Sequence, residues 1–430
     1  MDGRPDNGGS GRTHLVVVGL GYVGLPLVQA AIAAGMRVTG FDVAAGVVAG
    51  MQAGRSHVDD LSDQDIREAL EQGFTATTDP SVIADADVVV LCVPTPLAGD
   101  GRPDLDAVTD AVDQVVRYLR RRTLVVLEST TFPGTTEDVV LPMLQAGGLM
   151  LGEDFNLAFS PERIDPGNST YDIRNTPKIV GGVTAECTRL ASEFYGTFVE
   201  TVVQARGPRE AETAKLLENT YRHINIALVN EMARVCHELD IDIWNVVECA
   251  RTKPFGFEAF YPGPGVGGHC IPIDPNYLSY AIKSKLGYPL RFVELAQEIN
   301  NSMPQYVARR VQDLLNDDAI AVRGARVLLV GVTYKRDIAD QRESPADAVF
   351  AQLASLGAEL AYHDPYVPGW KPRCGVSIRQ VDDLSESLDE FDAVVVLQHH
   401  SNVDLDLVGE RHERVLDTRG KMTHKGVSRL

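Results

Sequence analysis

The stretch HLVVVGLGYVGLPL, residues 14–27, decides the fold of the first half of the chain. A short β-branched run leads into Gly19, Gly21 and Gly24, spaced as G-x-G-x-x-G, and an apolar helical pattern follows them. In such a strand–turn–helix unit the first glycine allows a tight turn and the second lets a pyrophosphate approach the backbone, while the third lets the helix pack closely on the strand. The helix N-terminus favours the negative charge of a phosphate. The segment therefore predicts a dinucleotide-binding unit.

An acidic residue, Asp42, stands at the end of the next predicted strand, residues 37–41. A carboxylate at this place binds the ribose 2′-hydroxyl and repels a 2′-phosphate, so the pattern favours NAD over NADP. The alternative interpretation is a glycine-rich turn with a solvated aspartate.

Short β-branched runs alternate with helical patterns over the first 180 residues, and a second series of the same kind begins after residue 325. Their continuous apolar character is typical of strands that are covered on both faces, as in parallel α/β sheets. The second series is too far along the chain to belong to the first sheet, so two α/β regions are expected. The predicted strands are His14–Val18, Arg37–Phe41, Val88–Cys92, Thr123–Leu127, Lys178–Val180, Arg326–Val330, Glu359–Tyr362, Ala393–Leu397 and Arg414–Leu416.

Between the two series, residues 209–239 are predicted to form one long helix, interpreted as a structural spine. Lys215, Asn219, Arg222 and Asn225 share one face of it, which suits either an oxygen-rich ligand or solvent. Apolar residues at steps of three and four would form a separate stripe. The stripe consists of Leu217, Tyr221, Ile224, Leu228, Met232, Val235 and Leu239.

The composition limits the classes of protein to be considered. A length of 430 residues suggests two or three domains, and 40 basic against 60 acidic residues give a formal charge of −20, which argues against a broad nucleic-acid surface. The six cysteines are scattered without a C-x-x-C pair, which indicates a reducing compartment and no zinc site. Residues 1–13 are interpreted as a disordered polar tail without a signal-peptide core. Residues 15–36 are uncharged but are interrupted by glycines and Pro26, so no membrane span is predicted.

A glycine- and proline-rich loop, residues 254–269, leads into the sequence GGHCIPID, residues 267–274. Cysteine is the side chain that adds to an aldehyde and later leaves a thioester as a thiolate, so Cys270 is a candidate nucleophile. Asp274, four residues further along the chain, is close enough to Cys270 to take part in proton transfer. A buried, unreactive cysteine is an equally good interpretation of this segment alone. The other five cysteines are predicted to lie in the core.

Two further loops follow apolar segments: ESTTFPGT at residues 128–135 and FSPER at residues 159–163. Loops at the carboxyl ends of parallel strands are where α/β sheets bind ligands. The hydroxyl groups of the first loop would either line the nicotinamide side of a dinucleotide site or cap the next helix. Glu162 in the second loop would act as a general base in a hydrolysis.

These segments together resemble the UDP-glucose/GDP-mannose dehydrogenase family of nucleotide-sugar 6-dehydrogenases. The resemblance covers nearly everything from His14 to Gly420. Its motifs are GLGYVGLPL, VPTPL, ESTTFPGTT, SPER, KLLENTYRHINIALVNE, YPGPGVGGHCIPIDP, GVTYKRD with RESP, and DTRG.

The resemblance implies an α/β fold of two Rossmann-like, doubly wound parallel-sheet domains joined by a long central helix. Residues 14–205 would bind NAD, residues 206–317 would form a helical dimerisation region with the cysteine loop, and residues 318–430 would bind the nucleotide sugar. The implied reaction is the four-electron oxidation of a C6 hydroxymethyl group to a carboxylate with two NAD, in a cytoplasmic homodimer. Polysaccharide biosynthesis or the glycosylation of a natural product is the pathway it would serve.

The family resemblance also implies roles for individual residues. Cys270 would hold the aldehyde as a thiohemiacetal and then as a thioester. Lys215 and Asn219 would stabilise the developing oxyanions, a task suited to fixed donors. Asp274, with Thr130 and water, would handle the proton of the alcohol.

Glu162 would assist hydrolysis of the thioester, and Arg251 or Lys253 would reach the substrate from the partner subunit. No metal is expected. NAD is expected to contact Gly19, Gly21, Tyr22, Val23, Gly24, Asp42, Pro94, Thr95, Ser129 and Thr130. The nucleotide sugar is expected to contact Glu162, Arg163, Lys215, Asn219, Arg222, Tyr261, Gly267, Tyr334, Lys335 and Arg419.

Two departures from the family pattern bear on the substrate and the cofactor. UDP-glucose dehydrogenases often carry lysine immediately before the aspartate that follows the cysteine, whereas this chain has Ile273. The sequence HCIPIDP resembles instead the branch that oxidises UDP-N-acetylhexosamines, such as UDP-GlcNAc and UDP-ManNAc. Val47 stands where the family often has a basic residue near the adenosine, which leaves that contact open.

Three other functions compete with this one. A UDP- or dTDP-glucose 6-dehydrogenase would differ by only a few pocket side chains. A two-electron dehydrogenase of the β-hydroxyacid type needs neither Cys270 nor a second Rossmann-like domain. A non-catalytic regulator that binds NAD or a sugar nucleotide needs no thiolate, so the joint presence of Cys270, Lys215 and Glu162 argues against it.

Overall fold

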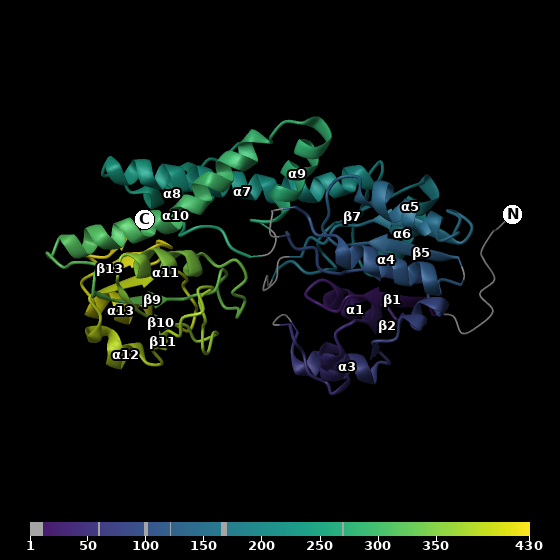
Figure 1. Ribbon diagram of the computed structural model, residues 1–430, viewed down its shortest axis with the longest axis horizontal. Coiled ribbons are helices and arrows are strands. Elements are labelled where there is room, and N and C mark those ends of the chain that lie inside the picture. The colour runs from purple at the N-terminus through teal and green to yellow at the C-terminus, as the bar shows by residue number, and fades with distance from the viewer. Residues whose placement is uncertain (1–11, 59–60, 99–101, 121, 165–169, 269–270) are drawn as a thin grey trace. The chain divides into compact units, whose positions relative to one another are not determined.

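The structure, a computed structural model, describes residues 12–58, 61–98, 102–120, 122–164, 170–268 and 271–430 (Figure 1). Most of the expected tail, residues 1–13, lies outside these ranges. The described residues form two compact units. The first runs to Leu217 and includes Asn276–Lys285, and the second consists of Glu218–Pro275 and Leu286–Leu430.

The first unit is built on a sheet whose described strands follow the order β3-β2-β1-β4-β5-β6-β7-β8. Neighbouring strands are parallel except for β6 and β7. The first six strands have the order of a Rossmann sheet, which binds ligands at its carboxyl edge where the order reverses, here between β1 and β4. The strands are β1 His14–Val18, β2 Arg37–Phe41, β3 Thr75–Thr77, β4 Val88–Leu91, β5 Thr123–Leu127, β6 Phe155–Phe159, β7 Lys178–Gly182 and β8 Val202–Gln204.

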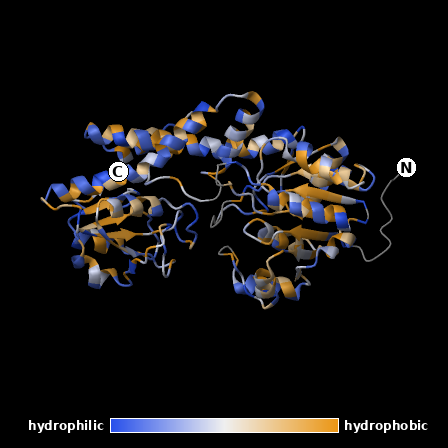
Figure 2. Ribbon diagram, in the orientation of Figure 1, coloured by the Kyte–Doolittle hydropathy of each residue, from blue (hydrophilic) through white to orange (hydrophobic). Residues whose placement is uncertain are grey.

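Helices cover both faces of this first sheet because its strands are apolar on both sides. Leu15 and Val17 of β1 belong to one core, and Val16 and Val18 belong to another. The strands are accordingly orange in Figure 2, as predicted for a parallel sheet that is buried on both faces. The helices of this unit are α1 Gly24–Ala33, α2 Ala45–Gln52, α3 Asp63–Glu71, α4 Asp106–Tyr118, α5 Leu141–Ala146 and α6 Ala185–Tyr195, with the short turns η1 Pro80–Asp85 and η2 Thr136–Val140.

The second unit contains a parallel sheet with the order β11-β10-β9-β12-β13-β14. Its central strand repeats the pattern of β1, since Val327 and Leu329 face one core and Leu328 and Val330 face another. The two Rossmann-like sheets expected from the family resemblance are therefore confirmed. The strands are β9 Arg326–Val330, β10 Glu359–His363, β11 Arg379–Gln380, β12 Ala393–Val396, β13 Val415–Asp417 and β14 Ser428–Arg429. The helices are α8 Ile243–Arg251, α10 Arg291–Asn316, α11 Pro345–Ser355, α12 Leu384–Ser387 and α13 Leu405–Arg411, with η3 Leu388–Glu390.

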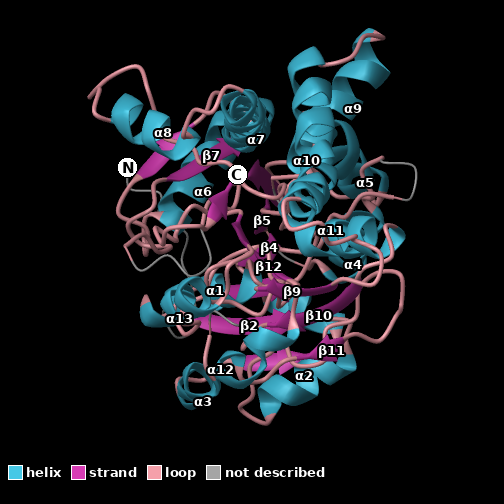
Figure 3. Ribbon diagram, turned by 90° about the vertical axis from the view of Figure 1, so that its left-hand side faces the viewer, coloured by secondary structure: helices cyan, strands magenta, loops and turns pink. Residues whose placement is uncertain are grey.

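The predicted central helix is α7, Pro208–Glu238, which runs unbroken in Figure 1 and is seen almost end-on in Figure 3. Its apolar stripe faces outward: Leu217 is 63% exposed, Leu228 is 53% exposed and Leu239 is 64% exposed. The buried side of the helix carries Lys215 and Asn219 instead. In the part of the chain that the structure describes, no helix has both the length and the apolar character needed to cross a bilayer.

Prediction and structure differ in two respects. The predicted strands do not include β6, which has five residues, nor β3, β8, β11 and β14, which have two or three residues each, too few for a periodic pattern to indicate them. Cys92, Cys187 and Cys236 are buried as predicted, but the core prediction is wrong for Cys249 and Cys374, which are exposed. Cys249 lies opposite the apolar face of α8, and Cys374 lies in the polar loop between β10 and β11.

Candidate functional site

The glycine-rich turn after β1 has the shape expected of a phosphate cradle. Gly19 has a φ of +91°, and a Cβ there would lie 2.7 Å from the carbonyl oxygen of Cys92. A Cβ on Gly24 would lie 2.0 Å from the carbonyl oxygen of Gly19, whereas a Cβ on Gly21 would meet nothing within 4 Å. Gly19 and Gly24 thus permit the turn itself, and the backbone at Gly21 is left open for a ligand.

The start of α1 offers its backbone N–H groups without competition from side chains. No side chain caps this helix, and its first turn contains no acidic residue. Tyr22 and Val23, in the turn, are half-buried. A helix N-terminus of this kind attracts phosphate, so these residues fit the pyrophosphate of a dinucleotide.

Asp42 is tied to the same turn from the end of β2. Its Oδ2 accepts a hydrogen bond from the backbone N–H of Leu20 at 3.0 Å, and its Oδ1 accepts one from Ala44 at 2.8 Å. The carboxylate is thereby oriented at the carboxyl edge of the sheet and keeps lone pairs for a ribose hydroxyl.

The loops after β4 and β5 complete this edge. Ser129 donates through its hydroxyl to the carbonyl of Val93 at 2.8 Å, while Thr130, next to it, is half-buried. Thr95 is buried and Pro94 is exposed. The hydroxyl of Tyr277, in α9 (Asp274–Leu286), donates to the carbonyl of Thr95. The predicted cofactor residues are therefore gathered along one edge.

A buried carboxylate that the sequence analysis missed, Glu212, fastens the loop after β5 to α7. Its Oε2 accepts from Gly134 N at 2.6 Å, and its Oε1 accepts from the backbone N–H and the hydroxyl of Thr136 at 2.9 and 2.7 Å. Burial raises the pKa of Glu212 to about 7, although the hydrogen bonds from Gly134 and Thr136 oppose the shift. Lys215 lies one turn further along α7, so Glu212 links the hydroxyl loop to the helix that carries this lysine.

Glu162 follows β6 and is largely buried. Its Oε1 accepts from the backbone N–H of Arg163 at 2.6 Å, and its Oε2 lies 3.4 Å from Nζ of Lys178. The Arg163 guanidinium donates through Nη1 to the carbonyl of Pro177. Glu162 is thus held by its own loop and by a lysine of β7.

Asn219 and Asp274 meet at the start of α9. The side-chain amide of Asn219 donates to Oδ2 of Asp274, and both residues are buried. Lys215 is also buried and occupies the same face of α7, one turn earlier. Cys270, the expected nucleophile, lies outside the described residues. Two of the residues expected around it are nevertheless in direct contact.

In the second unit, residues 261–268 of the glycine-rich loop run along the carboxyl edge of the second sheet. A Cβ on Gly267 would lie 2.6 Å from the Cβ of Tyr334, and one on Gly263 would lie 3.0 Å from Nη1 of Arg419. Arg419 donates through Nε to the carbonyl of Leu397 at 2.6 Å. The structure thus brings the predicted substrate residues Gly267, Tyr334 and Arg419 together.

Basic groups collect at this second edge. Burial lowers the pKa of Arg419 to about 10, against the opposing charge of Asp417. Burial also lowers the pKa of His399 to about 4, and the charges of Lys421, Arg419 and Arg336 add to the shift. Closely spaced basic groups of this kind, with Arg419 half-buried and Lys421 and Arg336 exposed, are suited to an anion such as a diphosphate.

Of this basic group, only Arg419 is predicted from the sequence, and His399, Lys421 and Arg336 are not. The signal that points to them is the pair His399–His400 directly after strand β12, at the carboxyl end of a parallel strand. Lys335, which was named, is half-buried, and its carbonyl accepts from the hydroxyl of Thr333 at 2.7 Å.

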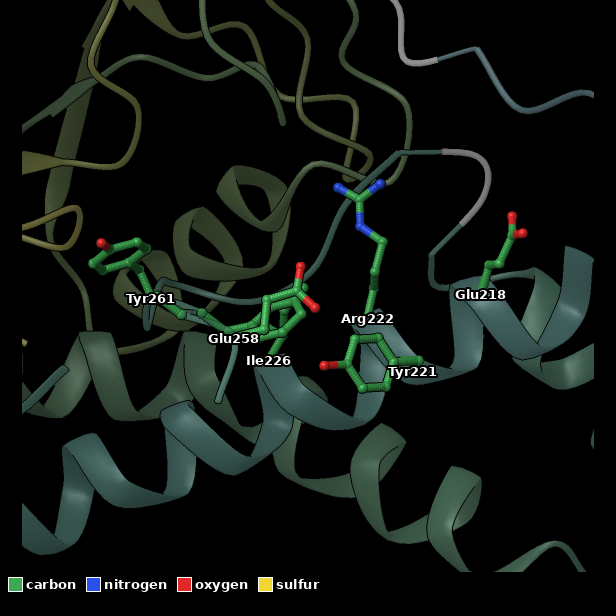
Figure 4. Close-up of a pocket in the computed structure, with 8 residues that line it drawn as sticks. Glu218, Tyr221, Arg222, Ile226, Glu258 and Tyr261 are labelled. Atoms are coloured by element: carbon green, nitrogen blue, oxygen red, sulfur yellow. The ribbon is translucent and has the colours of Figure 1, made fainter. Parts of the chain in front are cut away.

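A cavity of about 590 Å³ opens between α7 and the start of the glycine-rich loop (Figure 4). Arg222 extends from α7 beside it, and Tyr261 closes another side. Hydrogen bonding to Glu258 raises the pKa of Tyr221. Tyr261 stacks on Trp244 and donates to Glu248 at 2.8 Å. The predicted residues Arg222 and Tyr261 therefore line one cavity.

Predicted site residues therefore gather at the carboxyl edge of each sheet, and others lie along α7, where Asn219 meets Asp274 and where Arg222 and Tyr261 line the cavity. The described parts of the chain contain no cluster of three or more His, Cys, Asp or Glu side chains that would hold a metal ion.

Three consecutive regions of the chain match one protein family. Residues 13–199 match the NAD binding domain of the UDP-glucose/GDP-mannose dehydrogenase family, residues 209–302 match its central domain and residues 328–424 match its UDP binding domain. These assignments agree with the phosphate cradle of the first unit and with the cationic edge of the second.

Individual relatives cover almost the whole chain. A UDP-N-acetyl-D-mannosamine dehydrogenase from Pyrococcus horikoshii is 32% identical over 413 residues, which are 94% of this chain and 95% of that protein. A UDP-N-acetyl-D-glucosamine 6-dehydrogenase from Pseudomonas aeruginosa is 33% identical over 391 residues, 90% of each chain. The solved structure of a UDP-glucose dehydrogenase from Pyrobaculum islandicum is similar over 98% of both chains, with a TM-score of 0.86 and 26% identity.

Proposed function

The chain belongs to the UDP-glucose/GDP-mannose dehydrogenase family, and from this membership we propose that it oxidises the C6 hydroxymethyl group of a nucleotide-activated hexose to the uronate. The observation that carries the proposal is the pairing of a dinucleotide cradle on the first sheet with a cationic edge on the second, in a chain that matches all three family domains in order.

The residues of the first unit fit NAD. The open backbone at Gly21 and the uncapped α1 suit a pyrophosphate, and Asp42 suits a ribose with a free 2′-hydroxyl. NAD, when bound, accepts the hydride that each oxidation releases. Pro94, Thr95, Ser129 and Thr130 would line the remainder of this edge.

We assign the first oxidation to groups on α7, α9 and the loop after β5. Asp274, held by Asn219, takes the proton of the C6 alcohol with Thr130 and a water molecule. Lys215 and Asn219 donate to the oxygen on which negative charge develops.

In the second stage the sulfur of Cys270 adds to the aldehyde carbon and forms a thiohemiacetal, which becomes a thioester when two more electrons leave C6. Glu162 then takes a proton from the water that attacks the thioester carbonyl. The C–S bond breaks, Cys270 leaves as a thiolate, and the product is the uronate.

The second unit would hold the nucleotide of the substrate. Arg419 and its basic neighbours are suited to the diphosphate, and Tyr334, Lys335 and Gly267 lie at the same edge. Arg163, Arg222 and Tyr261 are proposed as further contacts of the sugar nucleotide.

A UDP-N-acetylhexosamine of the GlcNAc or ManNAc type is the favoured substrate. Ile273 stands in place of the lysine frequent in UDP-glucose dehydrogenases, and the two relatives named above act, by their names, on N-acetylated sugars. UDP- or dTDP-glucose is the second candidate, since a UDP-glucose dehydrogenase shares the architecture over almost the entire chain.

A panel of nucleotide sugars tests both the reaction and the substrate. With NAD in excess, the preferred UDP-N-acetylhexosamine is expected to yield two NADH per molecule consumed, and Cys270→Ser is expected to form no uronate while its NAD affinity stays near wild type. One NADH per sugar, or uronate formation by Cys270→Ser, would contradict the proposed thioester route.

We further propose that a second copy of this chain covers the exposed stripe of α7. The side chains of Leu217, Leu228, Met232, Val235 and Leu239 are each at least 40% exposed, and burying one large apolar side chain contributes about 1.5–3 kcal/mol. Leu228→Glu with Met232→Glu is then expected to turn a dimer into a monomer in analytical ultracentrifugation; a monomeric wild type would contradict the proposal. In such a dimer Arg251 or Lys253 would approach the partner's substrate.

The cytoplasm is the proposed location. Five cysteines, Cys92, Cys187, Cys236, Cys249 and Cys374, are free thiols, which is typical of proteins in a reducing compartment. The pathway proposed is polysaccharide biosynthesis, in which uronates of activated hexoses are building blocks.

A further inference from the structure

Five side chains meet inside the first unit, beside the carboxyl edge of its sheet: three come from the loops after β4, β5 and β6, one from β7 and one from α6. They form a group that we name the Lys178 cluster, and its members are Cys92, Glu128, Glu162, Lys178 and Tyr195. The side chains of Lys178 and Glu128 are 5% and 0% exposed, and that of Glu162 is 13% exposed. Of these five residues, only Glu162 takes part in the proposed reaction.

Lys178 is the hub of the cluster. Its Nζ lies 3.1 Å from Oε1 of Glu128, 3.4 Å from Oε2 of Glu162 and 5.2 Å from the centroid of the Tyr195 ring. The Tyr195 hydroxyl donates to Oε1 of Glu128, and Sγ of Cys92 lies 4.0 Å from the other oxygen of that carboxylate. One cation therefore serves two carboxylates.

The protonation states follow from burial and mutual charge. Burial favours the neutral amine of Lys178, but the charges of Glu128 and Glu162 outweigh it and raise the pKa of Lys178. Burial and the nearby Glu128 raise the pKa values of Cys92 and Tyr195, so both stay protonated at neutral pH. Burial also raises the pKa of Glu128, against the attraction of Lys178.

A buried ion pair contributes little net stability, because the desolvation of both charges offsets their attraction. Glu128 alone would neutralise Lys178. The second contact, between the ammonium of Lys178 and Glu162, therefore needs a functional explanation. Glu162 is the more exposed of the two carboxylates.

We propose that Lys178 is a positioning residue for Glu162, whose carboxylate it keeps oriented for taking a proton from the water that hydrolyses the enzyme-bound thioester. This inference rests on the proposed function. Both carboxylate oxygens of Glu162 have partners: Oε2 forms an ion pair with Lys178, and Oε1 accepts hydrogen bonds from the backbone N–H groups of Arg163 and Ile164. The Lys178 side chain itself is enclosed, 5% exposed, and acts through its contact with Glu162.

The step that Lys178 supports transfers no electrons to NAD. The water oxygen bonds to the thioester carbon, its proton passes to Glu162, the C–S bond breaks and its electron pair leaves with the sulfur of Cys270. Loss of the ammonium should therefore slow hydrolysis and spare both hydride steps.

The test removes the buried pair as a unit, because Lys178→Met alone would leave Glu128 unpaired. Lys178→Met with Glu128→Gln is mixed with NAD and the UDP-N-acetylhexosamine that gives the highest wild-type rate. We expect a burst of two NADH per active site, followed by a steady rate roughly 10- to 100-fold below wild type. Mass spectrometry of the quenched protein should show a covalent sugar-nucleotide adduct.

Two matched variants locate the effect. Lys178→Arg keeps a cation beside Glu162 and should hydrolyse the thioester without accumulating the adduct. Glu128→Gln alone keeps Lys178 beside Glu162 and should not accumulate it either. An adduct in Glu128→Gln, a wild-type profile in the double variant, or loss of the burst in the double variant would overturn the proposal.

Glu162→Gln, measured alongside, separates this inference from the function on which it rests. If Glu162→Gln accumulates the adduct and the double variant does not, the inference about Lys178 fails alone. If Glu162→Gln releases uronate at the wild-type rate, the proposed role of Glu162 fails and the inference falls with it.

Discussion

The first six strands of the first sheet have the same order as the six strands of the second sheet. The functional groups at the carboxyl edges of the two sheets nevertheless differ. The first edge presents a glycine-rich turn, the hydroxyl groups of Ser129 and Thr130, and carboxylates such as Asp42 and Glu162. The second presents a basic group in which the cations Arg336, Arg419 and Lys421 surround the uncharged imidazole of His399. The same topology therefore offers backbone N–H groups and bases in one unit and fixed cations in the other.

The two edges are therefore suited to different parts of one reaction. A phosphate bound by a helix N-terminus is held by backbone N–H groups, so the neighbouring side chains remain free for proton transfer. A diphosphate bound by cations uses the side chains themselves as ligands. We expect the first edge to govern the cofactor and the chemistry, and the second to govern affinity for the sugar nucleotide. Substitutions at each edge should then separate the two.

The largest separation is expected from Arg419→Met. A charge-assisted hydrogen bond contributes about 1.5–3 kcal/mol, and 1.4 kcal/mol corresponds to about tenfold in affinity. The KM for the nucleotide sugar should therefore rise about 100-fold, while the KM for NAD stays near wild type. Steady-state kinetics with each substrate varied in turn measures both.

Arg326→Met is the matched control, because Arg326 lies at the opposite, amino end of the same sheet and is exposed beside Asp392. It should leave both KM values unchanged. Equal losses for the sugar nucleotide and NAD in Arg419→Met would break the division between the edges.

The two edges also differ in how far the sequence predicts them. The first is local: G-x-G-x-x-G, a preceding strand and a following helix stand within residues 14–33, so Gly19, Gly21 and Gly24 could be assigned from spacing alone. The basic group of the second edge comes from three strand ends, and only Arg419 was identified, by its family motif. Spacing carries no information on which strand ends become neighbours.

The helix α7 also has a feature that the spacing of residues in the sequence does not predict. Its periodicity predicts the helix and its two faces, but not which face is buried. Lys215 and Asn219 turn inward because segments far away in the sequence bind this side of α7: Gly134 donates to Glu212, and Asp274 accepts from Asn219. Leu228 is left exposed. Lys178 and Glu128, which are 50 residues apart, escaped prediction for the same reason.

Glu212→Gln tests the first edge through the pH dependence of stability, because that edge depends on a buried carboxylate. The pKa of Glu212 is raised from 4.5 to about 7 in the folded state. The unfolded chain therefore loses its proton first, and this group's contribution to stability falls as pH rises from about 4.5 to 7. Between pH 5 and pH 7 the change amounts to about 2 kcal/mol in the free energy of unfolding.

Thermal unfolding of wild type and Glu212→Gln from pH 4.5 to pH 8 measures this contribution. The difference in Tm, wild type minus variant, should shrink with rising pH and level off above 7. A difference that grows with pH would mean that the hydrogen bonds of Gly134 and Thr136 outweigh burial.

The smallest effect is expected at Asp42, which contributes a single carboxylate to the first edge. Asp42→Ala removes the acceptor for a ribose 2′-hydroxyl and the negative charge that repels a 2′-phosphate. The loss of one such hydrogen bond corresponds to about tenfold in kcat/KM for NAD. The ratio of kcat/KM for NAD over NADP should fall by at least that factor, and the KM for the nucleotide sugar should not change.

Asp42 also holds the turn at Leu20, so a purely structural role would lower kcat/KM for NAD and NADP equally and leave their ratio intact. Asp42→Asn keeps an oxygen for Leu20 and loses the charge, and a fall in the same ratio for this variant assigns the preference to electrostatics at the first edge.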